Sequence, residues 1–561
     1  MTSTPNPSLK RVNFSFIFNA FCRRAKNGGG THVLLLLIAL CDMGCRMDPI
    51  TDYLATNGPS LTSDVAQYLV DTYRLIPAAA RKRVSRAGGE VRRLAGIVFP
   101  HKVRFLYLQQ QFGSPRYWES LAQALISANS AYGYAIAALR QRGGIVPASQ
   151  FPVVCGAPLR QQRQLSPDTI FERLSDAKLL TKVMLPGVGE CIAFVQEGER
   201  YETIADLMRA HLLTEDILLT AVKEWLRKLG IASFGQVAVR GDDTLPRVGT
   251  FAWDLSAPCY LGHMVRKGPD GTVKPGFVVC DVHLGADMTQ AGVAPFIRKC
   301  LTLRSLSKVG PCMQILVANR FHRDAFDLLK RHGIIPATPK SLFGKEVAEA
   351  LTQLISVLFN AARSIINPEQ FDELFGKLSR IEGAANQLRG TLFEYLAAEM
   401  ARQTLASDVS LNRIFKTPGK EAEADVVAVR PHQKITIIEC KGYSPRATIP
   451  HDLFKRWLEH NVPTCYAALK QHPDWKNLPV AFEFWATASL SEESMKLFAK
   501  AKANIRPSRY TIDLKLGPDL LAIIKQTRDP SMVVAFEKHF VKVEREPEIF
   551  PEDIDIGEFV F

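Results

Sequence analysis

Residues 423–442 read EADVVAVRPHQKITIIECKG, and this stretch decides the fold of the C-terminal part of the chain. It predicts two strands, EADVVAV and KITIIECKG, of which the second is apolar on both faces like a central strand. Side chains alternate along a strand, so Glu439 and Lys441 emerge on one face and Cys440 on the other. The sequence therefore predicts charged groups at the carboxyl end of a buried strand.

Helices and strands alternate on both sides of this stretch, which predicts an α/β layer. A helix is expected at 383–403, and further elements follow the two strands. They are a helix, a strand, a helix and a strand at 451–460, 480–488, 491–503 and 510–516. We place this domain at 384–542.

A similar series of elements precedes it, with the same order. Its strands are expected at 249–265, 276–285, 312–319 and 334–338, and its helices at 294–310 and 323–333. We place this domain at 246–340 and a helical connector at 341–383. The shared order of elements suggests an internal duplication.

Three acidic residues and one lysine of the later series point to chemistry. Glu394 lies on the expected helix, Asp425 on the first strand, and Glu439 and Lys441 on the second. A glutamate and a lysine at the end of a buried strand are costly unless they are paired or hold a metal. Carboxylate oxygens from adjacent strand ends suit Mg²⁺ (or Mn²⁺), and a nearby lysine can orient or deprotonate a water and offset transition-state charge.

Asp425, followed fourteen residues later by Glu439-Cys440-Lys441, resembles the motif of the PD-(D/E)xK superfamily of restriction-endonuclease-like, Mrr-type nucleases. The resemblance covers roughly residues 384–520. It implies that Asp425 and Glu439 are metal ligands, with the Cys440 backbone carbonyl as a third. Lys441 would be the catalytic lysine and Glu394 an additional acidic group. Ala424 departs from the family pattern, which has proline before the aspartate.

The resemblance implies a metal-dependent DNA endonuclease, in bacterial restriction or anti-phage defence. Two alternatives stay open: an RNA-cleaving or repair nuclease, and a non-enzymatic DNA-binding or adaptor protein. The plainest alternative for the motif is a surface aspartate beside a Glu–Lys salt bridge at a strand end.

The earlier series is also similar to that fold, most clearly over residues 315–338. At its strand ends lie Asp254 and the triplet Asp281-Val282-His283, and no lysine follows the acid. We therefore expect a degenerate, scaffolding copy. Another interpretation is a zinc site, because cysteine and histidine are its usual ligands. Its candidates are Cys259, His263, Cys280 and His283.

The positive charge is concentrated at the N-terminus. Residues 1–165 carry 20 Lys and Arg against 7 Asp and Glu, and so hold 13 of the 14 excess positive charges. The densest cluster is a candidate phosphate-binding surface, with a solvated helix face as the alternative. Its members are Arg81, Lys82, Arg83, Arg86, Arg92 and Arg93.

Short helices followed by a β-ribbon are typical of winged helices, which dock on proteins as well as on DNA. Residues 31–75 predict three helices, and 115–200 predicts helices running into two strands around Pro186-Gly187; a third copy is expected at 201–240. We assign a basic helical domain to 1–110 and winged-helix-like modules to 111–245. The fold class is α/β multidomain, with these modules followed by two restriction-endonuclease-like domains.

The remaining features concern location and partners. The longest apolar run, Val33–Cys41, is too short for a membrane span, and dispersed cysteines indicate a cytoplasmic protein without disulfides. No GxxxxGK[ST] loop occurs; Phe343-Gly344-Lys345-Glu346 lacks its first glycine and hydroxyl. Double-stranded DNA is the expected partner. A partner protein would have to supply any motor or sensor, and homo-oligomerisation stays open. The acidic segment 543–561 is interpreted first as a solvated tail and second as a self-inhibiting segment that mimics nucleic acid.

Overall fold

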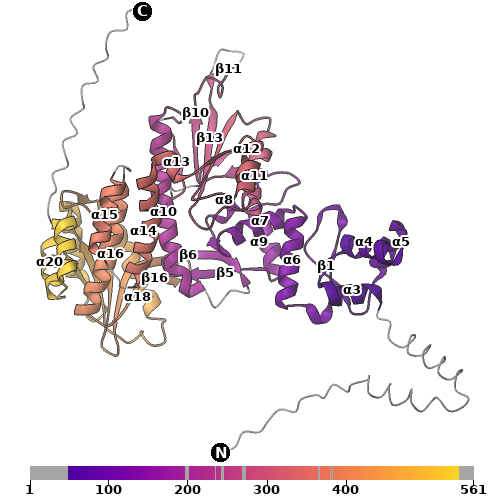
Figure 1. Cartoon of the computed structure of the whole chain (residues 1–561). Coiled ribbons are helices and arrows are strands. Elements are labelled where there is room, and N and C mark those ends of the chain that lie inside the picture. The colour runs from indigo at the N-terminus through magenta and orange to yellow at the C-terminus, as the bar shows by residue number, and fades with distance from the viewer. Residues whose placement is uncertain are drawn as a thin grey trace, which may run out of the picture. The chain divides into compact units, whose positions relative to one another are not determined.

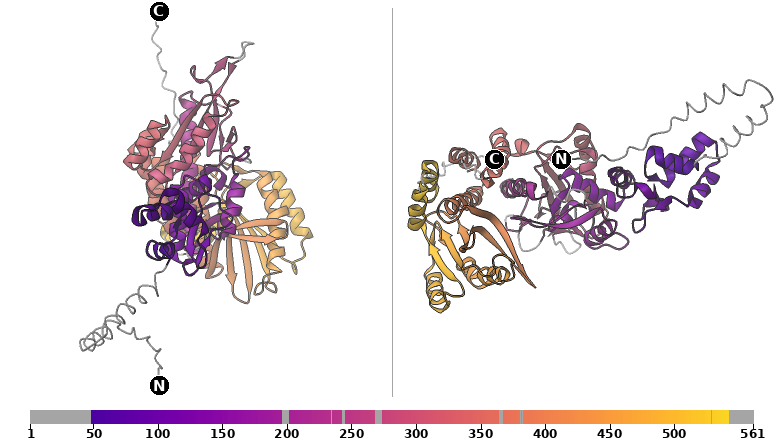
Figure 2. Two further views of the ribbon diagram at one scale, coloured as in Figure 1. Left: turned by 90° about the vertical axis from the view of Figure 1, so that its right-hand side faces the viewer. Right: turned by 90° about the horizontal axis from the view of Figure 1, so that it is seen from below.

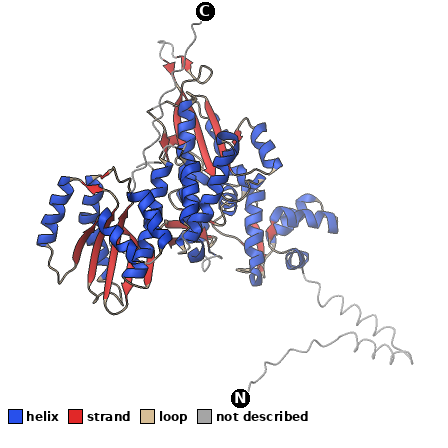
Figure 3. Ribbon diagram, turned by 60° about the vertical axis from the view of Figure 1, so that its left-hand side comes forward, coloured by secondary structure: helices blue, strands red, loops and turns tan. Residues whose placement is uncertain are grey.

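The computed structural model in Figure 1 describes residues 48–195, 201–233, 235–241, 245–267, 273–363, 367–379, 381, 383–527 and 529–541. The chain forms two compact units, divided between Ala124 and Leu125. Helices and strands are mixed throughout (Figure 3), which confirms the α/β multidomain class. Among the described residues, no helix combines the length and apolar character that a membrane span needs.

The first unit packs three helices against a small antiparallel sheet. The helices are α3 (Pro49–Asn57), α4 (Thr62–Tyr73) and α5 (Pro77–Arg86). Strands β1 (Ser60–Leu61), β2 (Val91–Arg93) and β3 (Phe105–Leu108) pair in the order β1-β3-β2. The predicted helices of this region match α3 and α4, whereas the one expected at 31–44 lies outside the described residues.

Helix α6 (Pro115–Ser127) leads into the second unit, where the arrangement recurs. Here the helices are α7 (Ala131–Gln141), α8 (Phe151–Val154) and α9 (Pro167–Asp176). Strands β4 (Ile145–Pro147), β5 (Leu180–Leu185) and β6 (Gly189–Phe194) pair in the order β4-β6-β5. The turn between β5 and β6 contains Pro186-Gly187, so the predicted two-stranded ribbon is present.

The third copy expected at 201–240 is wrong. Residues Tyr201–Lys228 form one long helix, α10, which ends before Gly230, whose φ is +65°. No glycine or proline interrupts the helix. Thr214 is buried within the helix, and its hydroxyl donates to Ala210 O at 2.8 Å. A single continuous helix therefore stands where a third winged helix was expected.

The first five-stranded sheet has the order β15-β14-β13-β10-β7. Strand β10 is antiparallel to β7 and β13, while β13, β14 and β15 are parallel. Because β7 belongs to it, the sheet begins before the expected boundary at residue 246. Its strands are β7 (Ala238–Val239), β10 (Leu255–Cys259), β13 (Gly276–His283), β14 (Cys312–Ala318) and β15 (Ile335–Ala337).

Helices cover both faces of this sheet. Helices α11 (Gln290–Arg304) and α12 (Arg323–Arg331) pack on one face, and α10 and α14 (Lys345–Ala362) on the other. Two short ribbons accompany it, β8 (Arg247–Val248) with β9 (Phe251–Ala252) and β11 (Arg266–Lys267) with β12 (Val273–Lys274).

The second sheet has the order β16-β17-β18-β20-β22 and repeats the strand directions of the first. The shared topology agrees with the suggested duplication. The sequence did not predict the edge strand β16. The strands are β16 (Asp408–Thr417), β17 (Lys420–Arg430), β18 (Lys434–Lys441), β20 (Val480–Ala486) and β22 (Thr511–Lys515).

Helices again lie on both faces of the second sheet (Figure 2). One face is covered by α16 (Ala384–Thr404), α20 (Gly517–Gln526) and α21 (Pro530–Phe536). The other is covered by α17 (His451–Arg456), the π-helical turn η4 (Trp457–Asn461), α18 (Val462–Leu469) and α19 (Glu492–Asn504). A small parallel pair joins β19 (Thr448–Ile449) to β21 (Ser489–Leu490).

The segment expected to be a connector is helical but is part of the core. It contains α13 (Pro339–Phe343), α14 and α15 (Pro368–Leu378). Buried residues of α14, α15 and α16 belong to one apolar cluster together with α10 and both sheets. The two sheets of the second unit therefore share a core.

The contact between α16 and the end of β18 provides a test of this packing. A Cβ built on Gly442 would lie 2.5 Å from Phe393 Cβ and 2.8 Å from Arg389 O. Gly442→Ala should lower the free energy of unfolding by about 1–3 kcal/mol through overpacking, measured by urea denaturation.

Gly390→Ala, on the same helix, is the matched control. A Cβ at Gly390 meets nothing within 4 Å, and alanine is favoured over glycine in a helix by about 0.5–1 kcal/mol. The two variants should shift the stability in opposite directions, and a neutral Gly442→Ala would show that the helix does not need this close approach.

Candidate active site

The candidate site lies where β17 and β18 part. Their last paired residues are Val426 and Ile438, and Asp425 and Glu439 follow one position beyond. On the other side of β17, the ladder with β16 skips the position of Asn412, which adopts a left-handed φ of +53°. The interrupted pairing leaves room for polar side chains at this end of the sheet.

The structure brings Asp425, Glu439 and Lys441 together, as the motif predicts. Lys441 Nζ donates to Glu439 Oε1 at 2.7 Å and to Cys440 O at 3.1 Å, and lies 3.6 Å from Asp425 Oδ2. The Cys440 amide donates to Asp425 Oδ2 at 2.7 Å. One ammonium thus lies among three oxygens supplied by two strands.

Glu394 also faces this group, from helix α16. Its carboxylate forms an ion pair with Arg209 of α10, and both side chains are largely buried. Burial and the Asp425 carboxylate raise the pKa of Glu394, while Arg209 opposes the shift. Arg209 was not predicted from the sequence, because the contact spans 185 residues.

Two further polar residues of the site were missed. Glu423 lies two residues before Asp425 on the same strand, and the alternation of side chains could have indicated it. Asn461, in the π-helical turn η4, donates to Glu439 Oε2 at 3.3 Å. Nothing in the sequence signals its place, because η4 is brought to the strand end by tertiary packing.

The site is electrostatically crowded. Burial and the Asp425 charge raise the pKa of Glu423 to about 7, and the same two causes raise the pKa of Glu439. Burial opposes the charge of Lys441, but Asp425 and Glu439 prevail and raise its pKa. Lys441 is therefore a cation here, which favours its role in orienting groups or offsetting charge over that of a base.

The donor set fits a hard divalent cation. The three oxygens around the Lys441 ammonium are those that the family motif implies as ligands, and Mg²⁺ binds through one or two carboxylates while retaining water. Within the described ranges, no three His, Cys, Asp or Glu side chains are already arranged as a metal site. A bound cation would thus displace the ammonium from between the carboxylates.

A cavity of about 320 Å³ adjoins these groups. It opens the carboxylates and Lys441 to a ligand. Its lining comprises Glu421, Ala422, Glu423, Asp425, Glu439, Lys441, Leu453, Arg456 and Asn461.

The first sheet carries the equivalent positions. Leu255 pairs with Cys280, so Asp254 and Asp281 again follow one position beyond. The Val282 amide donates to Asp254 Oδ2 at 2.9 Å, as the Cys440 amide does to Asp425. His283 takes the place of Lys441.

In the first sheet, however, both carboxylates form ion pairs with buried cations. Arg240 Nη1 donates to Asp254 Oδ1 at 3.2 Å, and Lys299 of α11 forms an ion pair with Asp281. Lys299 is fully buried and lies 3.9 Å from the centre of the Trp253 ring. The sequence did not signal this pair, because Lys299 stands directly beside Arg298 in the helix and nothing distinguishes it as the buried one. The first sheet thus has no free carboxylate pair for a metal.

The zinc interpretation is wrong for the described residues. Cys259 pairs with Gly276 at one end of the β10–β13 ladder, whereas Cys280 pairs with Leu255 at the other. The two cysteines therefore cannot share a metal. None of the described cysteines forms a disulfide.

The six basic residues of the first unit have different surroundings. Arg81, Lys82 and Arg86 are exposed on α5. Three others make contacts that hold the fold. Arg83 pairs with Asp48 at 3.1 Å, Arg92 Nε donates to Gln109 Oε1, and Arg93 donates to the carbonyls of Val84, Ser85 and Ala87 at the end of α5.

No protein-family model, curated protein or solved structure matches this chain. The interpretation of the site therefore depends on its geometry and on its motif.

The buried Lys299–Asp281 pair gives a stability prediction. Lys299→Met would leave Asp281 as an uncompensated buried charge, which costs about 3–5 kcal/mol. Urea denaturation should show that loss. Lys496→Met is the control, because Lys496 pairs with Glu492 on an exposed helix face and should contribute less than about 1 kcal/mol. Similar losses for the two variants would contradict the buried pair.

Proposed function

We propose that this chain is a metal-dependent nuclease of the PD-(D/E)xK type that hydrolyses phosphodiester bonds in DNA. The observation that carries the proposal is the convergence of Asp425, Glu439 and Lys441 at the parted ends of β17 and β18. Restriction or anti-phage defence belongs to the same proposal and depends on the family resemblance alone.

Asp425, Glu439 and the Cys440 carbonyl would hold Mg²⁺ or Mn²⁺, and such an ion would supply Lewis-acid chemistry and a template for the attacking water. Lys441 would present its fixed positive charge to the phosphate, where charge develops in the transition state. Asn461 orients Glu439, and Arg209 forms an ion pair with the nearby Glu394, which opposes the rise of its pKa on burial.

The first unit supports DNA as the substrate. Its three helices and the sheet order β1-β3-β2 are those of a winged helix, and the second such arrangement follows in 131–194. Helix α5, with Arg81, Lys82 and Arg86 exposed, has the length and charge of a helix that enters a groove of the duplex.

The main competing function is that of a non-enzymatic DNA-binding adaptor. The first sheet has the features of a scaffold, because its carboxylates are paired with Arg240 and Lys299. The second sheet differs, because four acidic side chains gather there beside a cavity. That difference favours an enzyme over an adaptor.

Cleavage should depend on the metal and on three side chains. With Mg²⁺, we expect the full chain to nick a duplex, and EDTA to stop it. Asp425→Asn, Glu439→Gln and Lys441→Ala should each lower the rate by at least about 10²–10³-fold, as when one transition-state contact is removed. The amide variants keep hydrogen-bonding atoms, so circular dichroism and melting should stay near wild type.

Glu492→Ala, on an exposed helix, is the control and should cut normally. An RNA duplex of the same sequence in the same assay distinguishes a DNA-cleaving from an RNA-cleaving enzyme. Undiminished cutting by Asp425→Asn, or cutting in EDTA, would refute the assignment.

The basic helix gives a second prediction. Replacing Arg81, Lys82 and Arg86 by Glu should weaken binding to unrelated duplexes alike and flatten the slope of log K against log salt by about 0.9 for each phosphate that is no longer neutralised. Fluorescence anisotropy over a salt series measures both. The control reverses three exposed lysines far along the sequence, Lys476, Lys496 and Lys500, at equal change in charge. Equal slopes for the two triple variants would identify α5 as a solvated face.

A further inference from the structure

A second cavity, of about 290 Å³, lies beside the first sheet. Its walls come from the end of α7, from β4, from α10 and from the loop after β13. One side is apolar, with Leu207 of α10 at its exposed edge. The apolar lining comprises Ile145, Val146, Pro147, Ile204, Leu207, Met208 and Leu212.

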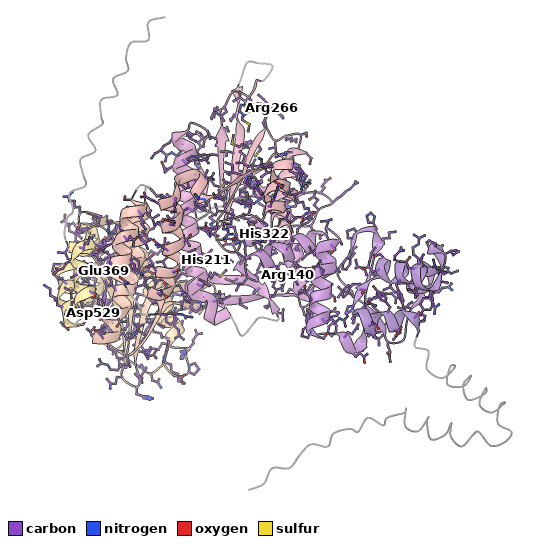
Figure 4. The ribbon with its side chains drawn as sticks, in the orientation of Figure 1. Arg140, His211, Arg266, His322, Glu369 and Asp529 are labelled. Carbon is purple, nitrogen blue, oxygen red and sulfur yellow. The ribbon has the colours of Figure 1, made fainter. Side chains whose placement is uncertain are left out.

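Polar groups without partners face this cavity. His283 is only 4% exposed, yet its Nε2 has no hydrogen-bond partner among the described residues. Nδ1 of His211, which lies on α10 (Figure 4), is also buried and without one. The half-buried Arg142 guanidinium forms no hydrogen bond or ion pair with any residue that the structure describes. A buried polar atom left in this way is costly, so the cavity lacks an occupant that would satisfy it.

The polar wall is held in place before any ligand binds. Gln141 Nε2 donates to the carbonyls of Ala286 and Asp287, and its Oε1 accepts from Thr289. Gly285 lets the His283 ring lie flat against the loop, since a Cβ there would be 2.6 Å from His283 Cε1. The polar wall of the cavity is therefore fixed by hydrogen bonds and close packing, and the cavity does not result from loose packing.

The histidines offer acceptors as well as donors. Burial and Arg142 lower the pKa of His283 to about 3, and burial lowers that of His211, so both rings are neutral at pH 7. His283 Nδ1 lies 3.9 Å from Glu215 Oε1. We assign the ring proton to Nδ1, the nitrogen on the side of this carboxylate, and in that tautomer Nε2 is an acceptor. Arg142 contributes only donors. A simple anion would satisfy Arg142 but would leave Nε2 without a donor.

The charges behind the cavity already balance, which also disfavours an anion. Asp216 pairs with Arg240 too, but its side chain is 45% exposed and solvated. Three buried carboxylates, Glu215, Asp254 and Asp281, lie among three cations. Arg240 pairs with Glu215 and Asp254, and Lys299 pairs with Asp281. Arg142 makes no ion pair but lies within electrostatic range of the same carboxylates. An added negative charge would upset that balance, whereas an uncharged polar ligand would not.

We infer that this cavity binds an uncharged heteroaromatic ring of the nucleobase class, with its faces against the apolar wall and its donor and acceptor edge toward Arg142, His211 and His283. Arginine forks match paired acceptors on a base edge, and the remaining donor of the base reaches His283 Nε2. The inference does not depend on the proposed nuclease function. The base can come from a free nucleoside or from a nucleic-acid strand.

Calorimetric titration of the full chain, without metal, tests the inference. The probes are guanosine, adenosine, cytidine and uridine, with benzoate as an aromatic anion of similar width. At least one nucleoside should bind saturably at submillimolar concentration, and benzoate should not. A short single strand in place of the nucleoside distinguishes the two sources: tighter binding of the strand identifies nucleic acid, and binding of the nucleoside alone identifies a free ligand.

Three variants locate the binding. Arg142→Lys keeps the charge balance but loses the fork, His283→Phe removes the acceptor, and Gly285→Ala displaces the ring of His283. Each should weaken nucleoside binding at least about tenfold, the effect of one good hydrogen bond. Asp425→Asn should bind nucleoside normally, which separates this site from the nuclease site. Absence of nucleoside binding, equal binding of benzoate, or undiminished binding in all three variants would overturn the inference.

Discussion

A carboxylate that leaves water needs a cation or several hydrogen-bond donors, and this requirement organises the second unit. Its two sheets place acidic residues at the same parted strand ends, held by the same backbone contact from the following amide. In the first sheet, Lys299 pairs with Asp281 and Arg240 with Asp254, and these ion pairs are buried. In the second sheet, Lys441 alone serves two carboxylates, and a cavity reaches them.

The contrast explains how one architecture can hold two kinds of site. In the first sheet the cations come from other elements, Lys299 from helix α11 and Arg240 from the residue after β7, so the acids become part of the core. The position that corresponds to Lys441 then holds a neutral histidine, His283. Where the cation is the lysine on the same strand, it can move away, because its side chain is long and the cavity lies beside it. The same pair of strand ends is thus enclosed in the core in one sheet and borders a cavity in the other.

Local patterns carried much of the prediction. The alternation in 434–441 placed Glu439 and Lys441 on one face, and the strand and helix boundaries of both series were largely found. The sequence pattern of one segment could not show which residues from distant segments contact it. Arg209, Lys299 and Asn461 reach their carboxylates only through tertiary packing, and β16 is an edge strand of mixed polarity. A third winged helix was expected at 201–240 on the likeness to the preceding modules, but one continuous helix spans 201–228. Composition marked the basic cluster but could not tell Arg93, which closes the end of α5, from Arg81, which faces solvent.

Helix α10 belongs to both halves of the second unit. Arg209 turns toward Glu394 beside the second sheet, and two residues on, His211 turns toward the cavity beside the first. The C-terminal domain is therefore not a detachable module, although its motif reads as one. A fragment beginning at residue 384 would keep every motif residue and lose the guanidinium that neutralises Glu394, together with the apolar face that α10 and α14 give to the common core. A truncated form of this protein therefore has to include α10. An evolutionary account in which the two sheets diverged after a duplication has to explain how both came to depend on this one helix.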